Sequence, residues 1–357
     1  MLTVLSVAFP FAPVGTRAAG GAERILTELD RALVAGGMRS LVVACERSDA
    51  AGELYAFPVP HQEPLDNAAQ AWCRRQCEAA IHRAMRSEHV DLIHMHNMDF
   101  WRYDLPPDVP VLVTLHLPIG WYPPDMWRSA SRLHFCCVSE SQRRTCPPEL
   151  QCSLVENGVA LSAATPALPR EDFAVAVGRI CPEKNAHAAL QAGTLAGMRV
   201  VLAGQVFPYR EHQDYMREKI EPLLAKRDNG VRHTCVGPVT SDDIGRLLAC
   251  ARCLLHPTLA PETSSLVAME ALAAGTPVIA YPSGALPEII DHGRTGFLVQ
   301  TVEEMAAAIR NVGSISPEVC RAEAERRFSL ERMVGCYFRL YKKTLHESEV
   351  QCYAALR

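Results

Sequence analysis

The stretch from Leu255 to Glu288, LHPTLAPETSSLVAMEALAAGTPVIAYPSGALPE, places two glutamates eight positions apart across a predicted strand-to-helix junction. Glu262 falls in the loop and Glu270 falls inside the helix. The apolar residues after the loop recur at helical spacing, and hydroxyl residues precede them, which predicts a helix that begins near Ser264. Because the unpaired backbone N–H groups of a helix start carry partial positive charge, this loop is suited to bind phosphate.

The same stretch resembles the signature of the family 4 (group 1) retaining glycosyltransferases of GT-B fold, in which two glutamates at this spacing are followed by segments like AAGTPV and GALPE. The resemblance implies that Glu270 holds the nucleotide ribose and that Glu262 faces the donor sugar. It also implies that the loop between them meets the diphosphate through Thr263, Ser264, Ser265 and Leu266. The family loop usually carries glycines and an aromatic residue. The bulkier hydroxyl residues in this loop therefore leave the identity of the donor sugar undecided. An ordinary amphipathic helix with two surface carboxylates is the alternative.

Length and composition indicate a two-domain enzyme. A chain of 357 residues exceeds what one hydrophobic core usually supports. The chain has 48% hydrophobic and 21% charged residues and no apolar run long enough to span a bilayer, which argues against an integral membrane protein. The N-terminal MLTVLSVAFPF lacks a basic leader, and we interpret it as a buried strand rather than a signal peptide. A net charge of −4 offers no general attraction for nucleic acid.

The cysteine content points to the cytoplasm. In a large α/β chain without a leader, the 14 cysteines are expected to be buried thiols rather than disulfides. Peripheral contact with the inner face of the membrane stays open as an alternative.

Both halves of the chain alternate apolar strands with helices, the pattern of parallel sheets covered by helices. Strands are expected at residues 2–8, 40–45, 90–96, 110–116 and 133–139, and again at 173–178, 199–204, 231–236, 252–257, 277–281 and 296–299. The predicted fold class is α/β, and the resemblance implies GT-B: two Rossmann-like parallel-sheet domains facing across a cleft. An acceptor-side domain is expected at 1–165 plus about 335–357, and a donor-binding domain at 166–334, with the C-terminal helix crossing back to the first domain.

Candidate residues of the first domain follow its strands, because ligands bind at the carboxyl ends of parallel strands. Gly20 and Gly21 precede a helix, allow close approach of a ligand and resemble the family's glycine-rich loop; a flexible surface loop is the alternative. His116 resembles the family histidine that lines the donor-sugar pocket; a core histidine is the alternative. Acceptor contacts, or packing, are expected of Trp121, Tyr122, Trp127 and Arg128.

The second domain supplies two candidate cations. Gly178 and Arg179 follow its first strand, and Lys184, the first lysine of the chain, lies five positions further on. A guanidinium and an ammonium can together neutralise a departing diphosphate, and the two match the family's pair residue by residue. Two surface cations at a helix start are the alternative, although the helix dipole opposes them. Gly204 and Gly237 resemble turns that shape the family's nucleotide pocket.

No metal or other cofactor is predicted. His94 and His96 share one face of a strand end without an evident third ligand, and Cys250-x2-Cys253 lacks a second pair. The chain has no Asp-x-Asp motif to chelate a divalent ion, no GxG and no Walker phosphate loop.

Together with these residues, the family resemblance implies a retaining, metal-independent hexosyltransferase. It would use a nucleotide-diphosphate sugar, with a UDP-sugar favoured because UDP is the family's commonest nucleotide, and a glycan, lipid-linked or small-molecule acceptor. The catalytic group is expected to be Glu262, His116, Arg179 and Lys184. Two alternatives stay open: a nucleotide-sugar epimerase of the same fold, and a non-catalytic protein that binds a glycan or a partner.

Overall fold

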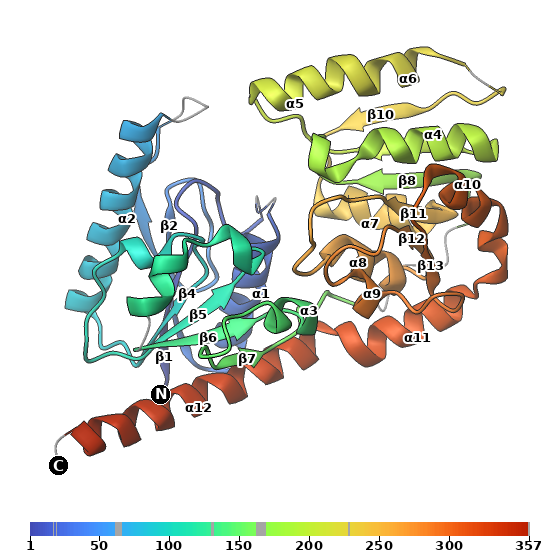
Figure 1. The fold of residues 1–357 in the computed structure, drawn as a ribbon. Coiled ribbons are helices and arrows are strands. Elements are labelled where there is room, and N and C mark those ends of the chain that lie inside the picture. The colour runs from blue at the N-terminus through green and yellow to red at the C-terminus, as the bar shows by residue number, and fades with distance from the viewer. Residues whose placement is uncertain are drawn as a thin grey trace. The chain divides into compact units, whose positions relative to one another are not determined.

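The structure is a computed structural model that describes residues 1–355, except 17, 19, 61–65, 130–131, 162–168 and 228, and except the side chains at 128–129 and 349–355. The chain divides into two compact units. Unit 1 contains Met1–Asn157 and Glu331–Arg357, and unit 2 contains Gly158–Leu330. Each unit is a parallel sheet with helices around it, so the predicted α/β class is confirmed (Figure 1).

Unit 1 is built on a seven-stranded sheet in the order β3-β2-β1-β4-β5-β6-β7, and each neighbouring pair is parallel. The strands are β1 (Thr3–Val7), β2 (Arg39–Cys45), β3 (Glu53–Phe57), β4 (Leu92–Met95), β5 (Val111–Leu115), β6 (Leu133–Cys137) and β7 (Cys152–Leu154). The helices are α1 (Gly21–Ala35), α2 (Asn67–Ser87), α3 (Glu140–Arg144) and α12 (Leu330–Ala355), with short 3-10 turns η1 (Phe100–Arg102), η2 (Ile119–Trp121) and η3 (Pro124–Ser129). The central strands β1 and β5 are buried along their whole length, as expected of a sheet covered on both faces.

Helix α12 belongs to unit 1 from Glu331 onward. Its Tyr337 and Tyr341 are fully buried, and their hydroxyls lie 3.3 Å from Thr114 Oγ1 and 2.9 Å from His94 Nδ1, on β5 and β4. The last helix of the chain is therefore part of the first sheet's core.

Unit 2 is built on a six-stranded parallel sheet in the order β10-β9-β8-β11-β12-β13. The strands are β8 (Phe173–Val177), β9 (Arg199–Ala203), β10 (Thr234–Gly237), β11 (Cys253–His256), β12 (Val278–Ala280) and β13 (Gly296–Leu298). The helices are η4 (Pro182–Lys184), α4 (Ala186–Ala196), α5 (Arg210–Tyr215), the π-helical η5 (Met216–Ile220), α6 (Glu221–Ala225), α7 (Ser241–Cys250), α8 (Leu266–Ala273), α9 (Leu286–Ile289), α10 (Val302–Asn311), η6 (Val312–Ser314) and α11 (Pro317–Phe328).

The strand order reverses between β1 and β4 in unit 1 and between β8 and β11 in unit 2. In open parallel sheets, ligands bind outside the carboxyl ends of the strands at such a switch point. The loop after β8 carries Arg179 and Lys184, and the loop after β11 carries Glu262. The fold of unit 2 thus puts these three predicted site residues on the two loops that flank its switch point.

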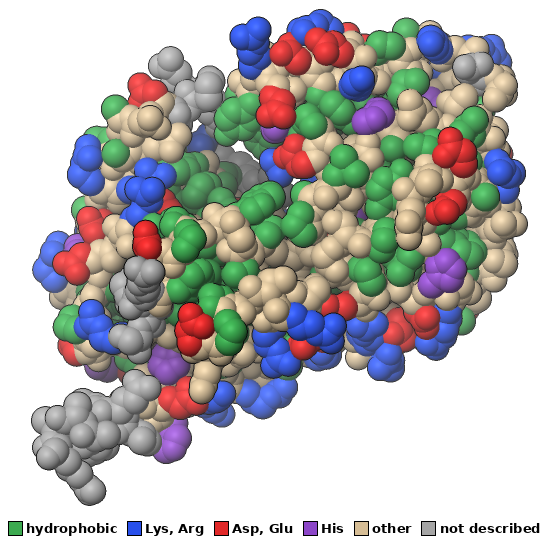
Figure 2. Space-filling model, viewed as in Figure 1, with side chains coloured by type: hydrophobic (Ala, Val, Ile, Leu, Met, Phe, Trp, Pro, Cys, Tyr) green, Lys and Arg blue, Asp and Glu red, His purple; other side chains and the backbone are tan. Residues whose placement is uncertain are grey.

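The surface carries charges of both signs. On the face drawn in Figure 2, Lys and Arg side chains lie interspersed with Asp and Glu side chains. Across the part of the chain that the structure describes, no helix is both long enough and apolar enough to cross a membrane.

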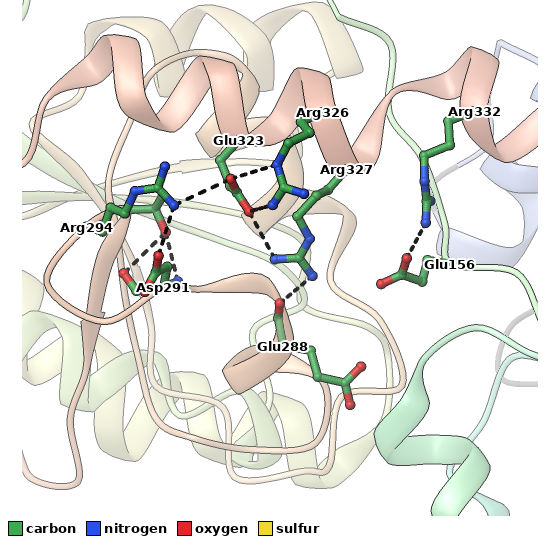
Figure 3. A network of polar contacts seen from close by, with 9 residues as sticks. Glu156, Glu288, Asp291, Arg294, Glu323, Arg326, Arg327 and Arg332 are labelled. Carbon is green, nitrogen blue, oxygen red and sulfur yellow. Dashed lines mark hydrogen bonds and ion pairs between the residues drawn. The ribbon is translucent and has the colours of Figure 1, made fainter.

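Ion pairs fix the ends of the C-terminal helices within each unit (Figure 3). In unit 1, Arg332 of α12 lies 2.5 Å from Glu156, which follows β7. In unit 2, Glu323 of α11 is 5% exposed and pairs with Arg326 at 2.6 Å and Arg327 at 3.3 Å. Both of these contacts link side chains within the last turns of α11.

Candidate active site

Two side chains converge on one carboxylate oxygen of Glu262 in unit 2. Lys184 Nζ forms an ion pair with Glu262 Oε1, and His256 Nε2 lies 3.5 Å from the same oxygen. The side chains of Lys184, His256 and Glu262 are 24%, 7% and 12% exposed. We call these three residues the Glu262 cluster. Because His256 ends β11 and Lys184 follows β8, the cluster lies at the switch point of the sheet.

The cluster keeps Glu262 ionised. Burial alone would raise the pKa of the Glu262 carboxyl, but the hydrogen bond and charge of His256 and the ammonium of Lys184 lower that pKa to about 2. The carboxylate can therefore orient hydroxyl groups or stabilise positive charge near neutral pH. It cannot donate a proton there, because it carries none.

The main chain of Glu183 holds the two loops of the cluster together. Leu259 N donates to Glu183 O at 2.8 Å, and Thr258 Oγ1 donates to the same oxygen at 3.3 Å. Glu183 immediately precedes Lys184, so these bonds fix the lysine beside the loop that carries Glu262.

A third loop, between β12 and α9, holds the main chain of Glu262. Ala285 N donates to Glu262 O at 2.7 Å, and Ser283 Oγ donates to Ala260 O at 2.7 Å. Gly284 has φ +58°, and a Cβ at this position would lie 2.1 Å from Glu262 O and 2.5 Å from Glu262 N. Only glycine fits here, because a side chain would displace Glu262.

The ion pairs of α11 extend this support. Arg327, held by Glu323, also donates to the carbonyl oxygen of Glu288 in α9 at 2.7 Å (Figure 3). Helix α9 begins two residues after Gly284. The position of the Gly284 loop is therefore tied to helix α11 through α9.

Helix α8 begins at Leu266, two residues after the predicted start. Its N-cap residue, Ser265, makes no side-chain capping bond, and its hydroxyl instead lies 3.4 Å from His256 Nε2. The Ser264 hydroxyl is buried and has no hydrogen-bond partner among the described residues. Thr263 and Glu270 are half-buried. The Ser265 side chain therefore leaves the backbone N–H groups in the first turn of α8 uncapped, as an anion-binding helix start requires.

Arg179 is the more exposed of the two predicted cations. Its side chain is 47% exposed, and its guanidinium lies 3.5 Å from Glu183 Oε1. The structure thus links Arg179 to the same residue whose carbonyl fixes the β11–α8 loop.

Three predicted glycines meet at the ends of neighbouring strands. A Cβ at Gly204 would lie 1.7 Å from Gly178 O, and Gly204 N donates to Gly237 O at 2.8 Å. The loops after β8, β9 and β10 therefore pack backbone against backbone, which side chains at Gly204 would prevent.

The predicted histidine of unit 1 ends a chain of three rings. His94 Nδ1 lies 3.1 Å from His96 Nε2, and His96 Nδ1 lies 3.2 Å from His116 Nε2. His94 Nε2 also lies 2.8 Å from Thr114 Oγ1. We call the three residues the histidine chain. Burial lowers the pKa of all three, that of His116 to about 4, so the rings are neutral near pH 7.

His116 follows β5 and is only half-buried. His96 contacts one nitrogen of this neutral ring, and the exposed part of the ring can still reach a ligand. This arrangement suits hydrogen bonding to a sugar hydroxyl.

The predicted acceptor aromatics differ in exposure. Trp121 is 57% exposed, whereas Tyr122 is 3% exposed and its hydroxyl accepts a hydrogen bond from Leu117 N at 3.2 Å. Trp127 is half-buried, with its ring centroid 5.8 Å from that of Tyr122. Of the three aromatic residues, therefore, only Trp121 presents a largely exposed ring, and Tyr122 is a core residue. The Arg128 side chain lies outside the described residues.

The predicted glycines before α1 pack against a carboxyl group. Gly20 is the N-cap residue of α1, and a Cβ there would lie 2.0 Å from Glu23 Oε2. Glu23 is 7% exposed, and burial raises the pKa of its carboxyl. Gly21, the first residue of α1, is exposed. A side chain at Gly20 would therefore displace the carboxyl group of Glu23, whereas Gly21 is open to solvent.

Two groups of metal-ligand side chains occur among the described residues. Cys181, Glu183 and His212 place ligand atoms within 4.8 Å of one another, and the buried His212 Nδ1 has no hydrogen-bond partner there. The second group is Cys137, Cys146 and Cys152. Within the described ranges, the Cys250-x2-Cys253 and His94-x-His96 pairs belong to no group of three.

Sequence reasoning missed His256 and Gly284. His256 closes a parallel strand, the same signal that identified His116, and could have been found that way. Gly284 lies in the segment GALPE, which was noted only for its resemblance to the family signature. Its contact with Glu262, 22 positions earlier in the chain, depends on how two loops fold together.

The chain is similar in sequence to known proteins. The family model described as glycosyl transferases group 1 matches residues 161–326, and that of glycosyltransferase family 4 matches residues 19–163. The D-inositol 3-phosphate glycosyltransferase of Mycobacterium marinum is 30% identical over 187 residues, which is 50% of this chain and 39% of that protein. The matched segment thus spans about two fifths of this relative's length.

Solved structures match over nearly the whole chain. Sucrose-phosphate synthase from Thermosynechococcus elongatus has a TM-score of 0.78 at 20% identity, covering 97% of this chain and 100% of that one. Anabaena HepE in complex with UDP-glucose has a TM-score of 0.70 at 20% identity, covering 97% and 100%. At these identities the likeness shows a shared GT-B fold.

Proposed function

We propose that this chain, which belongs to the group 1 glycosyltransferases of GT-B fold, is a retaining enzyme that moves a sugar from a nucleotide-diphosphate donor to a glycan, lipid-linked or small-molecule acceptor. The observation that carries the proposal is the Glu262 cluster at the switch point of unit 2. We assign donor binding to unit 2 and acceptor binding to unit 1.

The diphosphate would be held by Arg179, Lys184 and the first-turn amides of α8. An ammonium group has three N–H donors, so Lys184 can keep its bond to Glu262 and still reach a phosphate oxygen. As the glycosidic bond breaks, negative charge builds on the leaving diphosphate, and fixed cations and amides stabilise it. These groups would replace a divalent cation, so we propose that transfer needs no metal.

In unit 2 the sugar would be held by Glu262; for His116, in unit 1, we propose a hydrogen bond to a sugar hydroxyl. The ionised Glu262 can orient sugar hydroxyls and stabilise the positive charge that develops at the anomeric carbon. In this mechanism the acceptor attacks from the face that the diphosphate leaves, without an obligatory enzyme nucleophile. Glu270, in α8, would accept hydrogen bonds from the ribose, and the exposed Trp121 would contact the acceptor.

A UDP-sugar is the preferred donor. The structure of HepE with UDP-glucose, a protein with the same fold, supports this choice. The presence of Arg179, Lys184, Glu262 and Glu270 together favours a transferase over a protein that only binds a glycan, because binding alone does not require stabilisation of a leaving group.

The proposal is tested in two steps. Thermal unfolding with UDP, GDP or ADP identifies the base, because a ligand that binds only the folded state raises the melting temperature. Radiolabelled donors are then incubated without acceptor: slow release of free sugar supports a transferase, whereas a new nucleotide sugar would indicate an epimerase. The anomeric configuration of the released sugar, read by NMR before mutarotation, tests retention. No response to any nucleotide would refute the proposal.

A further inference from the structure

Three cysteines of unit 1 come together beside the end of its sheet. Cys137 ends β6, Cys146 follows α3, and Cys152 begins β7, which pairs with β6. Cys146 Sγ lies 3.5 Å from Cys137 Sγ and 3.6 Å from Cys152 Sγ, and all three sulfur atoms lie within 4.8 Å of one another. We propose that these residues, the cysteine cluster, form a thiolate site for a soft d10 metal ion, Zn²⁺ or Cu⁺.

The sulfur spacing fits metal ligands. With a Zn–S bond of about 2.3 Å and tetrahedral angles, two ligand sulfurs lie about 3.8 Å apart, whereas a disulfide holds them at about 2.05 Å. The two observed separations, 3.5 and 3.6 Å, are close to the ligand value. Small side-chain movements would therefore bring three sulfurs onto one ion. Thiolates select thiophilic ions such as Zn²⁺ and Cu⁺ over Mg²⁺ or Ca²⁺.

The charges around the cluster favour a thiolate, the form that binds metal. Cys152 Sγ donates a hydrogen bond to Cys146 Sγ, and the positive charge of the Arg143 guanidinium acts on Cys146. Arg143 lies on α3 and pairs with Glu140 at 2.8 Å. A cation bound here would be stabilised by this arrangement as it displaces the protons of the three thiols.

The cluster is accessible from one side. Cys137 is buried, whereas Cys146 and Cys152 are half-buried, so an ion can enter from their side. Within the described residues, no fourth Cys, His, Asp or Glu joins the group, which leaves a fourth position for water or a small ligand.

The connection to α3 gives metal binding a structural consequence. Gln142 of α3 is 4% exposed, and its Nε2 donates to the carbonyl oxygens of Leu115 and Leu117, both at 2.8 Å. These residues flank His116. An ion that ties Cys146 to the two strands would hold α3, and with it the main chain around His116.

The test uses the full-length protein, reduced and stripped of metal. Zn²⁺ is titrated in competition with a chromophoric chelator, Cu⁺ is titrated anaerobically in the same way, and Co²⁺ reports thiolate ligation through its charge-transfer absorption. We expect one ion per chain, a rise in melting temperature on binding, and at least 100-fold weaker binding in Cys146→Ser and Cys152→Ser. Cys250→Ser is the matched control, because Cys250 is also half-buried but lies outside the cluster; this variant should bind like wild type.

A second measurement does not depend on variants. Saturation of wild-type protein with the bound ion should protect the three cluster thiols, and no others, from alkylation in peptide mass spectrometry. Equal affinity in wild type and Cys146→Ser would overturn the proposal, as would a disulfide among the three cysteines that forms in air while no metal binds. UDP binding does not involve these residues, so failure here leaves the proposed transferase function standing.

Discussion

The close contact between Gly284 and Glu262 allows a sharp test of how the active site is positioned. In Gly284→Ala, the new Cβ would lie 2.1 Å from Glu262 O, although real Cβ contacts are essentially never shorter than 3.0 Å. The main chain of Glu262 must therefore move by about 1 Å, and a displacement of that size in an active site can lower the rate about 100-fold. We expect kcat to fall by about that factor.

Backbone strain must be separated from this displacement. Alanine at positive φ costs roughly 1–2 kcal/mol wherever it occurs. Gly293 supplies the control, because it has φ +79° and a Cβ added there would meet no other atom within 4 Å. Gly293→Ala should therefore lose only this strain cost, roughly 1–2 kcal/mol of the free energy of unfolding, and should keep the kcat of wild type.

The assay combines urea unfolding of both variants with turnover on the preferred nucleotide sugar, measured as release of free nucleotide. Calorimetric titration of UDP shows whether the nucleotide still binds. Equal kcat values in the two variants would refute the inference that Gly284 positions Glu262.

Three further predictions concern the two glutamates, metal and pH. Glu270→Ala should mainly raise KM for the donor, because a ribose is bound similarly before and during reaction, whereas Glu262→Gln should mainly lower kcat; calorimetry of UDP would contradict this if only Glu262→Gln lost affinity. Initial rates should persist in excess EDTA, and a complete loss that manganese or magnesium restores would overturn metal-independent transfer. Burial lowers the pKa of every ring in the histidine chain, so protonation disfavours the folded state. The free energy of unfolding should fall by up to about 1.4 kcal/mol per pH unit for each ring as the pH drops from about 6.5 towards about 4, and urea midpoints that do not change across this range would contradict it.

The sequence predicted the sheets well because their strands are buried. Each expected strand between residues 173 and 299 corresponds to one of β8 to β13. The strands it missed, β3 and β7, lie at the two edges of the first sheet, where partial exposure weakens the apolar pattern.

Contacts across long sequence separations could not be predicted. The fit of Gly284 against Glu262 depends on two loops that follow different strands, and the meeting of Cys137 with Cys152 depends on the pairing of β6 with β7. A pattern such as Cys250-x2-Cys253 is visible in the sequence, yet its residues join no group of ligands among those described. Spacing along the chain identifies local motifs, whereas the order of strands in the sheet decides which motifs meet.

The Glu262 cluster also explains how a carboxylate and a diphosphate can share one site. A carboxylate with a pKa of about 2 would repel an anionic donor, and Lys184 compensates that charge while it binds phosphate. Lys184→Ala should therefore weaken UDP binding for two reasons. It removes a phosphate contact, and it leaves a buried carboxylate without its compensating charge. In the Lys184→Ala background, Glu262→Gln should then restore part of the UDP affinity, although the same substitution alone should leave that affinity nearly unchanged. Calorimetric titration of UDP into the wild type, both single variants and the double variant gives the coupling between the two side chains. Additive losses would mean that Lys184 acts on the phosphate alone and that Glu262 does not oppose the donor's charge.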